Sequence, residues 1–334
     1  MDDEFITLDS VSVHFRSRSN LGLRRSAVHA LDKLSLTISM GEVLGIVGES
    51  GCGKSTLGRV ILGLQMPTDG SVYVDGKRVP HARPGVNAKR YGFQIVFQDS
   101  ASSLNPRMRV NTIIAEPLAD QKLIQSRLNE RIKDVLRDVG LDPSFVERYP
   151  EELSGGQQQR VAIARALAPH PRLIVLDEAA SALDTSTQAQ VLNLLKDLKD
   201  KQDVTYVFIS HDIATVKFMS TRVAVMYLGE IVEILDPALI DKSALHPYTI
   251  CLRSAVPFPD PIVERSRTRI VPQGPVPSLI SPPPACRFHT RCPIAQPKCS
   301  IDKPALARVD GARYVACHYV GQFEALFDRS GGTG

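Results

Sequence analysis

The chain has 334 residues and a formal net charge of +4 at pH 7, with 40 basic against 36 acidic side chains. This length allows one large domain and a smaller one. So mild a charge argues against a protein that coats nucleic acid. No apolar run reaches the roughly eighteen residues that a membrane span needs, and the acidic first residues do not have the layout of a signal peptide. We therefore expect a cytoplasmic protein whose 6 cysteines are thiols or metal ligands.

Short strands are predicted on both sides of one glycine-rich turn. Residues 5–15 alternate between apolar and polar side chains, and residues 34–38 and 72–74 give two shorter strand patterns. An aspartate–glycine pair after the last of these is typical of a hairpin turn. Between the first two strands we expect a solvated loop at residues 16–27, whose basic members are Arg16, Arg18, Arg24 and Arg25. An antiparallel patch should therefore surround the turn.

The glycine-rich turn fits the phosphate-loop pattern G-x-x-x-x-G-K-[ST] at every fixed position. A strand pattern at 43–47 precedes it, and we expect a helix at 57–64 after it, which disfavours an ordinary turn. Its backbone N–H groups can surround an anion, and the helix that follows points its positive end at bound phosphates. Lys54 would reach the β and γ phosphates, and Ser55 would bind Mg²⁺ with Thr56 beside it. The predicted ATP-binding residues of the turn are Gly48, Glu49, Ser50, Gly51, Cys52, Gly53, Lys54, Ser55 and Thr56.

The middle of the chain is predicted to be mostly helical. A strand at 94–97 ends at Gln98, and apolar residues at helical spacing predict a helix at 124–139. Ser154 and Gln157 form a capping-box pattern at the start of a further helix. Capping alone leaves the glycines at 155 and 156 unexplained, because glycine in a first turn costs stability. A cap whose N–H groups are open to a phosphate accounts for both.

Two further strands end at polar residues. A buried strand pattern at 173–176 leads into Asp177 and Glu178, and another at 205–209 leads to His211. Adjacent carboxylates at a buried strand end are costly unless they meet a cation or transfer protons. In a parallel α/β sheet, ligands bind beyond the carboxyl ends of the strands. The phosphate loop and these two strand ends therefore predict one site.

Together these motifs resemble the ATP-binding cassette (ABC) ATPases over roughly residues 5–235. The phosphate loop is similar to the family's Walker A motif, residues 173–178 to its Walker B motif, and residues 153–157 to the LSGGQ signature. The resemblance implies an α/β fold of the phosphate-loop NTPase type. It has a RecA-like parallel sheet core, an N-terminal antiparallel β subdomain and a helical subdomain at about 99–165. Residues 1–235 would form the nucleotide-binding domain and residues 236–334 a small C-terminal extension.

The resemblance also implies roles for single residues. Two ATPase subunits sit head to tail in this family, and each ATP lies between one subunit's Walker A motif and the other's signature. Asp177, with Ser55 and Gln98, would hold Mg²⁺, and Glu178 would act as general base on the attacking water. His211 would contact the γ-phosphate, and Gln98 would couple the site to membrane subunits. The remaining implied residues are Ser154, Gly155, Gly156 and Gln157 for the partner's ATP, Asp184 in the D-loop, and Phe15 for adenine stacking.

A narrower resemblance is to the oligopeptide/dipeptide importers. It rests on three segments. These are residues 97–107, which include Gln98, the His-Pro-Tyr element at 245–249, and the cysteine-bearing tail that follows the three prolines at 282–284. Residues 16–27 and 55–59 look more like the "F" than the "D" subunit, while Ala179-Ala180 departs from the usual pattern after Walker B.

This second resemblance implies an ATPase that powers peptide import from the cytoplasmic face of the inner membrane. Its partners would be a second, paralogous ATPase, two transmembrane permease subunits and, through them, an extracytoplasmic substrate-binding protein, with no nucleic acid. Import of nickel, an opine or another small solute stays open, and so does a non-transport ABC ATPase. The heptad runs and second cassette that are common in the latter class are missing from this sequence.

Four cysteines of the tail could hold a metal centre. Cys286, Cys292, Cys299 and Cys317 are separated by five, six and seventeen residues, which is wider than the usual pairs of a zinc site or a ferredoxin. The resemblance to peptide importers favours a [4Fe–4S] cluster, while zinc and four reduced thiols remain alternatives. We expect Cys52 and Cys251 to serve in packing.

Overall fold

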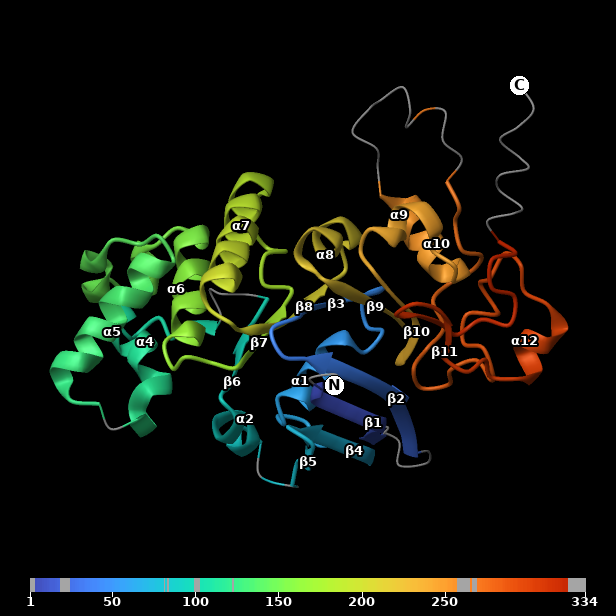
Figure 1. The fold of residues 1–334 in the computed structure, drawn as a ribbon, viewed down its shortest axis with the longest axis horizontal. Helices are drawn as coiled ribbons and strands as arrows, with labels where there is room; N and C mark the ends of the chain where they lie inside the picture. Colours follow the sequence, from blue (N-terminus) through green and yellow to red (C-terminus); the bar gives the residue numbers. More distant parts are fainter. Residues whose placement is uncertain are drawn as a thin grey trace.

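The computed structural model describes residues 4–18, 25–80, 82, 84–98, 103–121, 123–256, 265 and 269–323. Within these ranges, two sheets with a helix between them form the middle of the molecule, and further helices cover the other face of the larger sheet (Figure 1).

The larger sheet has the strand order β11-β12-β10-β9-β3-β8-β7-β6. The strands β6, β7, β8, β3 and β9 are parallel, so their carboxyl ends lie at one edge. β10, β12 and β11 then add antiparallel pairs. The bounds are β3 Val43–Val47, β6 Phe93–Val96, β7 Leu173–Asp177, β8 Thr205–Ser210, β9 Arg222–Tyr227, β10 Glu230–Leu235, β11 Ala307–Asp310 and β12 Arg313–Val315.

The smaller sheet is the predicted antiparallel patch, in the order β2-β1-β4-β5. Its strands are β1 Glu4–Arg18, β2 Arg25–Ser39, β4 Asp69–Val74 and β5 Lys77–Arg78. The expectation of a loop at 16–27 was wrong at both ends. The β1–β2 ladder continues through the pairs Arg16–Ala27 and Arg18–Arg25, because cross-strand hydrogen bonding extends past the apolar alternation. Arg24 lies outside the described residues.

The helix α1, Lys54–Ile61, lies between the two sheets. It starts three positions before the expected Leu57, directly at the phosphate loop. Successive residues of the parallel strands face opposite sides of the sheet, so the strands contribute to two separate cores. Ile46 and Val207 pack toward α1 and the smaller sheet, whereas Val47 and Phe208 pack toward the helices of the opposite face. The expected strand burial on both faces is therefore confirmed.

A helical subdomain follows β6 and lies at one end of the molecule, coloured green in Figure 1. Two arginines join its helices. Arg131 donates to the carbonyl oxygens of Leu167 (2.8 Å) and Ala168 (2.9 Å), and Arg160 donates to that of Val139 (2.8 Å). These bonds satisfy carbonyls that helix ends leave without partners. Its helices are α4 Val110–Ala115, η1 Glu116–Gln121, α5 Gln125–Asp138, η2 Pro143–Glu147, η3 Pro150–Glu152 and α6 Gly155–Leu167, with α2 Val86–Tyr91 before β6.

The C-terminal extension lies at the opposite end of the molecule, orange and red in Figure 1. It is attached to the larger sheet through β12, which pairs with β10. Glu233 of β10 is fully buried, and its carboxylate accepts hydrogen bonds from the N–H groups of Leu245 (2.9 Å) and His246 (3.0 Å). The helices outside the helical subdomain are α7 Thr185–Lys201, α8 Ile213–Met219, α9 Leu239–Ser243, α10 Pro247–Ala255 and α12 Pro297–Ile301.

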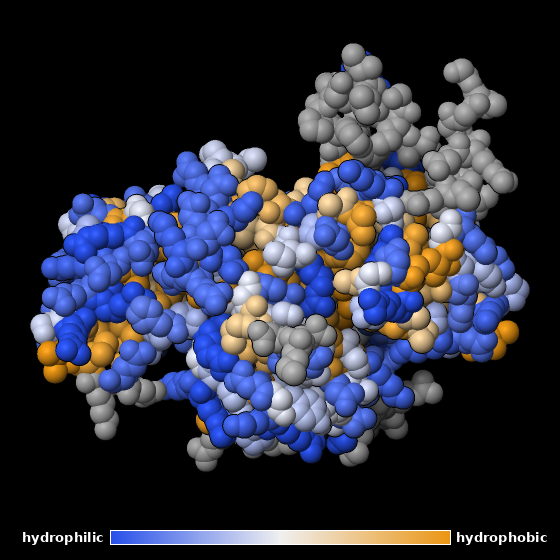
Figure 2. All heavy atoms as spheres, in the orientation of Figure 1, coloured by the Kyte–Doolittle hydropathy of each residue, from blue (hydrophilic) through white to orange (hydrophobic). Residues whose placement is uncertain are grey.

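The visible surface differs between the two ends of the molecule. Figure 2 shows mainly hydrophilic atoms over the helical subdomain and more apolar atoms around the middle and the extension. None of the helices in the described ranges has the length and apolar character needed to cross a membrane.

Candidate functional site

The phosphate loop, residues 48–56, leaves β3 and enters α1 with glycine at two positions that admit no side chain. A Cβ on Gly48 would lie 2.2 Å from the carbonyl oxygen of Met226. Gly53 has a φ of 109°, and a Cβ there would lie 2.3 Å from the carbonyl oxygen of Ala30. Gly53 is also the N-cap of α1 and has no side chain with which to cap it. The first N–H groups of α1 are therefore available to an anion.

The loop places a cation and a hydroxyl at the head of α1. The Lys54 ammonium donates to the carbonyl oxygens of Gly48 (2.8 Å) and Glu49 (3.1 Å), which holds it within the curl of the loop. Ser55 Oγ donates to Asp177 Oδ1 at 2.9 Å, although the two residues are 122 positions apart. Hydroxyl and carboxylate oxygens are the ligands that Mg²⁺ prefers, so these side chains fit the ion.

Two carboxylates stand at the end of β7 in different environments. Burial raises the pKa of Asp177, and the hydrogen bond from Ser55 opposes that rise. Glu178 has a φ of 51°, an unfavourable value for a residue with a side chain, and its N–H donates to the carbonyl oxygen of Ile209 (2.9 Å). Its Oε2 lies 3.2 Å from His211 Nδ1. The adjacent strands β7 and β8 thus bring these predicted residues together.

Gln98 and Phe15 lie at the surface. Gln98 comes two residues after the end of β6 and is exposed. Phe15 is in β1, opposite Val28 of β2, and 40% of its surface is exposed. An exposed ring on a strand can stack on a base, and the adenine-stacking role of Phe15 stays a prediction.

The signature residues begin α6, in the helical subdomain and apart from α1 (Figure 1). The predicted capping box is confirmed. Ser154 Oγ accepts from the Gln157 N–H (3.4 Å), and Gln157 Oε1 accepts from the Ser154 N–H (3.0 Å). A Cβ on Gly156 would lie 2.5 Å from Thr187 Cγ2 of α7, whereas one on Gly155 would have its nearest neighbour at 3.8 Å. Packing against α7 therefore explains Gly156, and an open approach remains the explanation for Gly155 only.

Asp184 of the D-loop is the N-cap of α7. Its Oδ1 accepts from the Thr187 N–H at 2.9 Å and from the Ser186 hydroxyl at 2.6 Å. These hydrogen bonds, that of Ser186 first, hold the pKa of Asp184 well below its usual range. The carboxylate therefore stays charged at neutral pH, at the positive end of the helix.

The C-terminal extension reaches the phosphate loop, a contact that was not predicted from the sequence. The Glu49 N–H donates to Tyr248 Oη at 2.8 Å. Arg291 Nη1 donates to both carboxylate oxygens of Glu49, at 2.8 and 3.1 Å. The His-Pro-Tyr element and the cysteine-bearing tail were visible as motifs, but Arg291 is 242 positions from its partner. No periodic pattern connects residues at such a separation.

The four cysteines of the tail line one pocket, together with His246 and Phe288. Burial raises the pKa of Cys286 to about 11 and that of Cys292 to about 12. Within the described ranges, no three His, Cys, Asp or Glu side chains are grouped so that they could hold a metal ion. The four thiols therefore share a pocket, but no three of them are placed in the described structure so that they could ligate one metal ion. Cys52 and Cys251 are buried, as a packing role requires.

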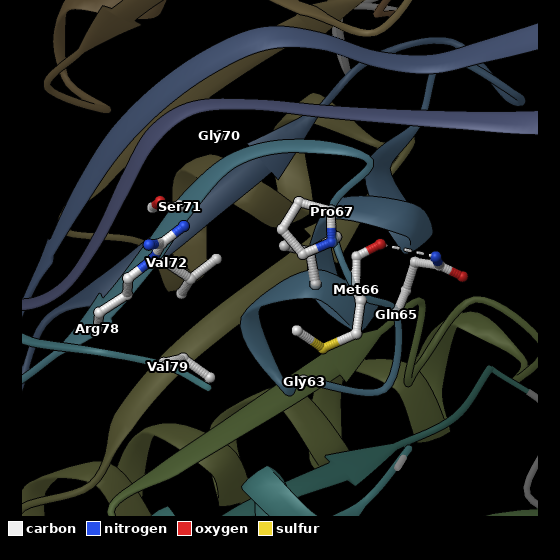
Figure 3. A pocket seen from close by; sticks show the side chains of 10 residues that line it. Gly63, Gln65, Met66, Pro67, Gly70, Ser71, Val72, Arg78 and Val79 are labelled. Carbon is white, nitrogen blue, oxygen red and sulfur yellow. Dashed lines mark hydrogen bonds between the residues drawn. The ribbon is translucent and has the colours of Figure 1, made fainter. Parts of the chain in front are cut away.

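A separate pocket lies beyond the C-terminal end of α1, against β4 and β5 (Figure 3). In it, the Gln65 amide donates to the carbonyl oxygen of Met66 at 2.9 Å. None of the predicted site residues lines this pocket. We therefore assign it no part in the chemistry.

Comparisons with known proteins agree with these motifs. A family described as "ABC transporter" matches residues 31–181, and one described as "Oligopeptide/dipeptide transporter, C-terminal region" matches residues 232–299. The oligopeptide transport ATP-binding protein AppF of Bacillus subtilis (strain 168) is 44% identical over 320 residues, which cover 95% of this chain and 97% of AppF. For the oligopeptide transport ATP-binding protein OppF of Escherichia coli (strain K12), the identity is 49% over 280 residues, or 83% and 84% of the two chains.

Solved structures share the fold. The ATP-binding cassette MJ0796, solved as a dimer in a post-hydrolysis state with ADP and Pi, has a TM-score of 0.61 and 31% identity. The match covers 70% of this chain and 98% of that one. With the phosphate loop, the β7 carboxylates and the signature all in place, the chain is an ATPase, and it belongs to the ABC transporter ATP-binding subunits of the oligopeptide/dipeptide branch.

Proposed function

We propose that ATP hydrolysis by this subunit powers the import of peptides through an ABC transporter. The observation that carries the proposal is the C-terminal region at 232–299, which is of the oligopeptide/dipeptide transporter type and packs against the phosphate loop. Relatives named for oligopeptide transport, similar over almost the whole chain, support it. Import of nickel, an opine or another small solute is the alternative, because the ATPase motifs do not distinguish among these cargoes.

The site residues are assigned roles by their positions. Lys54 and the N–H groups at the head of α1 bind the phosphates, which concentrates positive charge where negative charge develops. Glu178 takes the proton of the attacking water, and His211, 3.2 Å from it, orients this carboxylate and reaches the γ-phosphate. Phe15 stacks on adenine.

Mg²⁺ would be held by Ser55 and Asp177, whose side-chain oxygens are 2.9 Å apart, with Gln98 as a further ligand. When bound, the ion supplies charge neutralisation on the phosphates. Asp177 serves it best as a carboxylate, although burial raises the pKa of this group. The cation would reverse that effect of burial.

The ATP site is completed by a second subunit in this proposal. Ser154, Gly155, Gly156 and Gln157 act on the ATP held by the partner's phosphate loop, and Asp184 lies at the same interface. Support comes from the exposed start of α6, apart from α1, and from the dimeric state of the related cassette. We further propose that the partner is a paralogue. The pair would sit on two permease subunits at the cytoplasmic face of the inner membrane, supplied by an extracytoplasmic binding protein.

The chain is proposed to divide into a nucleotide-binding domain at 1–235, with its helical subdomain at about 99–165, and an extension at 236–334. The end of β10 at Leu235 supports this boundary. The extension nevertheless keeps a strand in the larger sheet, because β12 pairs with β10. The two parts therefore share one sheet.

The four tail cysteines are proposed to hold a [4Fe–4S] cluster that stabilises the extension. The thiols line one pocket, and a small proline-rich region has little core of its own. Protein purified without oxygen should be brown, with about four irons per chain, and Cys292→Ser should lose both colour and iron. If elemental analysis finds zinc in place of iron, the site is a zinc site. If it finds neither metal, the four cysteines are reduced thiols.

Uptake by cells tests the proposed cargo. Deletion of the gene should abolish energy-dependent uptake of a labelled tripeptide, and the wild-type gene should restore it. A Glu178→Gln version, expressed to the same level, should fail to restore it. Loss of nickel uptake with peptide uptake intact would favour the alternative, and co-purification with ribosomes in place of permease subunits would favour a non-transport ATPase.

A further inference from the structure

We propose that Arg291 and Tyr248 of the C-terminal extension are positioning residues for ATP binding, because they fix the geometry and cancel the charge of Glu49 in the phosphate loop. The inference rests on the proposed role of this loop in holding the phosphates. The extension is then part of the nucleotide site. If the extension only covered the sheet or attached the subunit to a partner, it would not affect the phosphate loop.

Tyr248 holds the backbone at the start of the loop. Its hydroxyl accepts the Glu49 N–H at 2.8 Å, and its ring is fully buried. The ring lies against Tyr227, at 4.6 Å between centroids, and against Phe288, at 5.3 Å. Phe288 is close to Tyr227 as well, at 5.2 Å. A hydroxyl carried on a packed aromatic cluster has little freedom, so it defines where the loop leaves β3.

Arg291 offsets the negative charge of Glu49. A carboxylate in a loop that binds phosphates repels them, and the Glu49 side chain is part of that loop. Arg291 Nη1 contacts both oxygens of this carboxylate, and its own side chain is only 8% exposed. Tyr227 Oη lies 3.4 Å from the same nitrogen. The guanidinium therefore neutralises the carboxylate and keeps it turned toward the extension.

A second buried arginine supplies a matched comparison. Arg287 has a side chain 6% exposed and bonds to Asp32 (2.7 Å), Glu230 (2.9 Å) and the carbonyl oxygen of Leu228. It ties the extension to β2 and β10, and its hydrogen bonds and ion pairs among the described residues join it to residues other than Glu49. General loosening of the extension should follow from loss of either arginine, whereas the effect on Glu49 belongs to Arg291.

The experiment measures MgADP affinity of the full-length chain by calorimetry, with thermal unfolding recorded for every variant. Arg291→Gln should weaken binding about three- to tenfold, because one uncompensated charge then faces the phosphates. Adding Glu49→Gln to this variant should restore affinity to within about twofold of wild type, since the repulsion is gone. Arg287→Gln should lower the unfolding temperature and leave affinity within about twofold of wild type.

The tyrosine has its own control. Tyr248→Phe removes one hydroxyl and should weaken MgADP binding about threefold, because the Glu49 N–H loses its acceptor. Tyr206→Phe removes another buried hydroxyl, which has no hydrogen-bond partner among the described residues, and should leave binding unchanged. This pair keeps the test valid if Arg291→Gln does not fold. In the assembled transporter, both Arg291→Gln and Tyr248→Phe should raise KM for ATP more than they lower kcat.

Results that would overturn the inference differ from those that would contradict the proposed function. Folded Arg291→Gln and Tyr248→Phe proteins that bind MgADP as tightly as wild type would overturn the inference. So would an affinity loss in Arg287→Gln equal to that in Arg291→Gln, or a failure of Glu49→Gln to restore binding. Wild-type protein that binds no MgADP would instead contradict the proposed role of the phosphate loop.

Discussion

The proposed chemistry of this molecule depends on side chains at the carboxyl edge of three adjacent strands, β3, β8 and β7. The phosphate-loop residues could be predicted because the motif has a fixed local spacing. The meeting of Ser55 with Asp177, and of Glu178 with His211, could be predicted because parallel strands end at one edge. The pair of Glu49 and Arg291 could not, since it depends on how a distant segment packs.

Glu178→Gln should separate binding from chemistry at the residue scale. The amide keeps the size of the side chain and its place beside His211 but cannot accept a proton. We expect nearly unchanged affinity for MgATP and a turnover lower by about 10²–10⁴-fold, as for loss of a general base. Turnover is measured in the assembled transporter, and a rate equal to that of the wild type would remove Glu178 from this role.

At the scale of elements, the structure explains two features of the strands that secondary-structure propensity did not predict. The β1–β2 ladder extends beyond its apolar alternation, because a long hairpin is stabilised by its own cross-strand bonds. β9, β10, β12 and β11 belong to one sheet although β10 and β11 are about seventy residues apart in the chain. Such pairing is set by tertiary packing, so it leaves little trace in local sequence.

The contact between α6 and α7 predicts unequal effects of alanine substitution at two neighbouring glycines. Gly156→Ala would place a methyl group 2.5 Å from Thr187 Cγ2, and such overpacking costs about 1–3 kcal/mol of unfolding free energy. Gly155→Ala meets only an ordinary contact and should cost far less. Thr187→Ser, which removes the clashing methyl, should recover most of the loss in the Gly156→Ala background. Urea denaturation checks these values, and equal costs at both glycines would show that packing against α7 is not the reason.

A bidentate ion pair joins the two sheets and gives a pH dependence. Arg172, just before β7, donates to both oxygens of Asp75 at 2.8 Å, and this lowers the pKa of Asp75. A carboxyl with a lowered pKa in the folded state stabilises the fold above its unfolded pKa and loses that effect as pH falls. Both side chains are well exposed, so the pair contributes only about 0.5 kcal/mol after solvent screening. Asp75→Asn should therefore destabilise slightly at pH 7 and not at pH 2.5 in urea titrations. A penalty that persists unchanged at pH 2.5 would contradict this account.

At the scale of the whole molecule, the extension and the nucleotide-binding fold form one structure. They share a sheet through β12 and β10, and they share the phosphate loop through Glu49. The signature, by contrast, stands apart from the loop of its own chain (Figure 1). In the proposed dimer, a single copy would therefore carry two half-sites, and a partner would complete each of them.

This arrangement predicts a weak ATPase in isolation. The purified chain at low concentration should hydrolyse ATP slowly, because the ATP in its phosphate loop then lacks the signature of a partner. Addition of the permease and the second ATPase should raise the rate substantially. A control with Ser154→Arg, which blocks the start of α6, should bind MgADP normally and fail to respond to the partners. Full activity in a dilute, monomeric preparation would return residues 154–156 to the role of a helix cap.

Peptide-driven ATP hydrolysis is tested most directly by measuring peptide uptake and ATP hydrolysis together in vesicles that contain the reconstituted transporter and its binding protein. We expect that peptide stimulates ATP hydrolysis, that labelled peptide accumulates only with ATP, and that Glu178→Gln abolishes both. ATP hydrolysis that ignores peptide, with no peptide accumulation in vesicles whose assembly is intact, would contradict it.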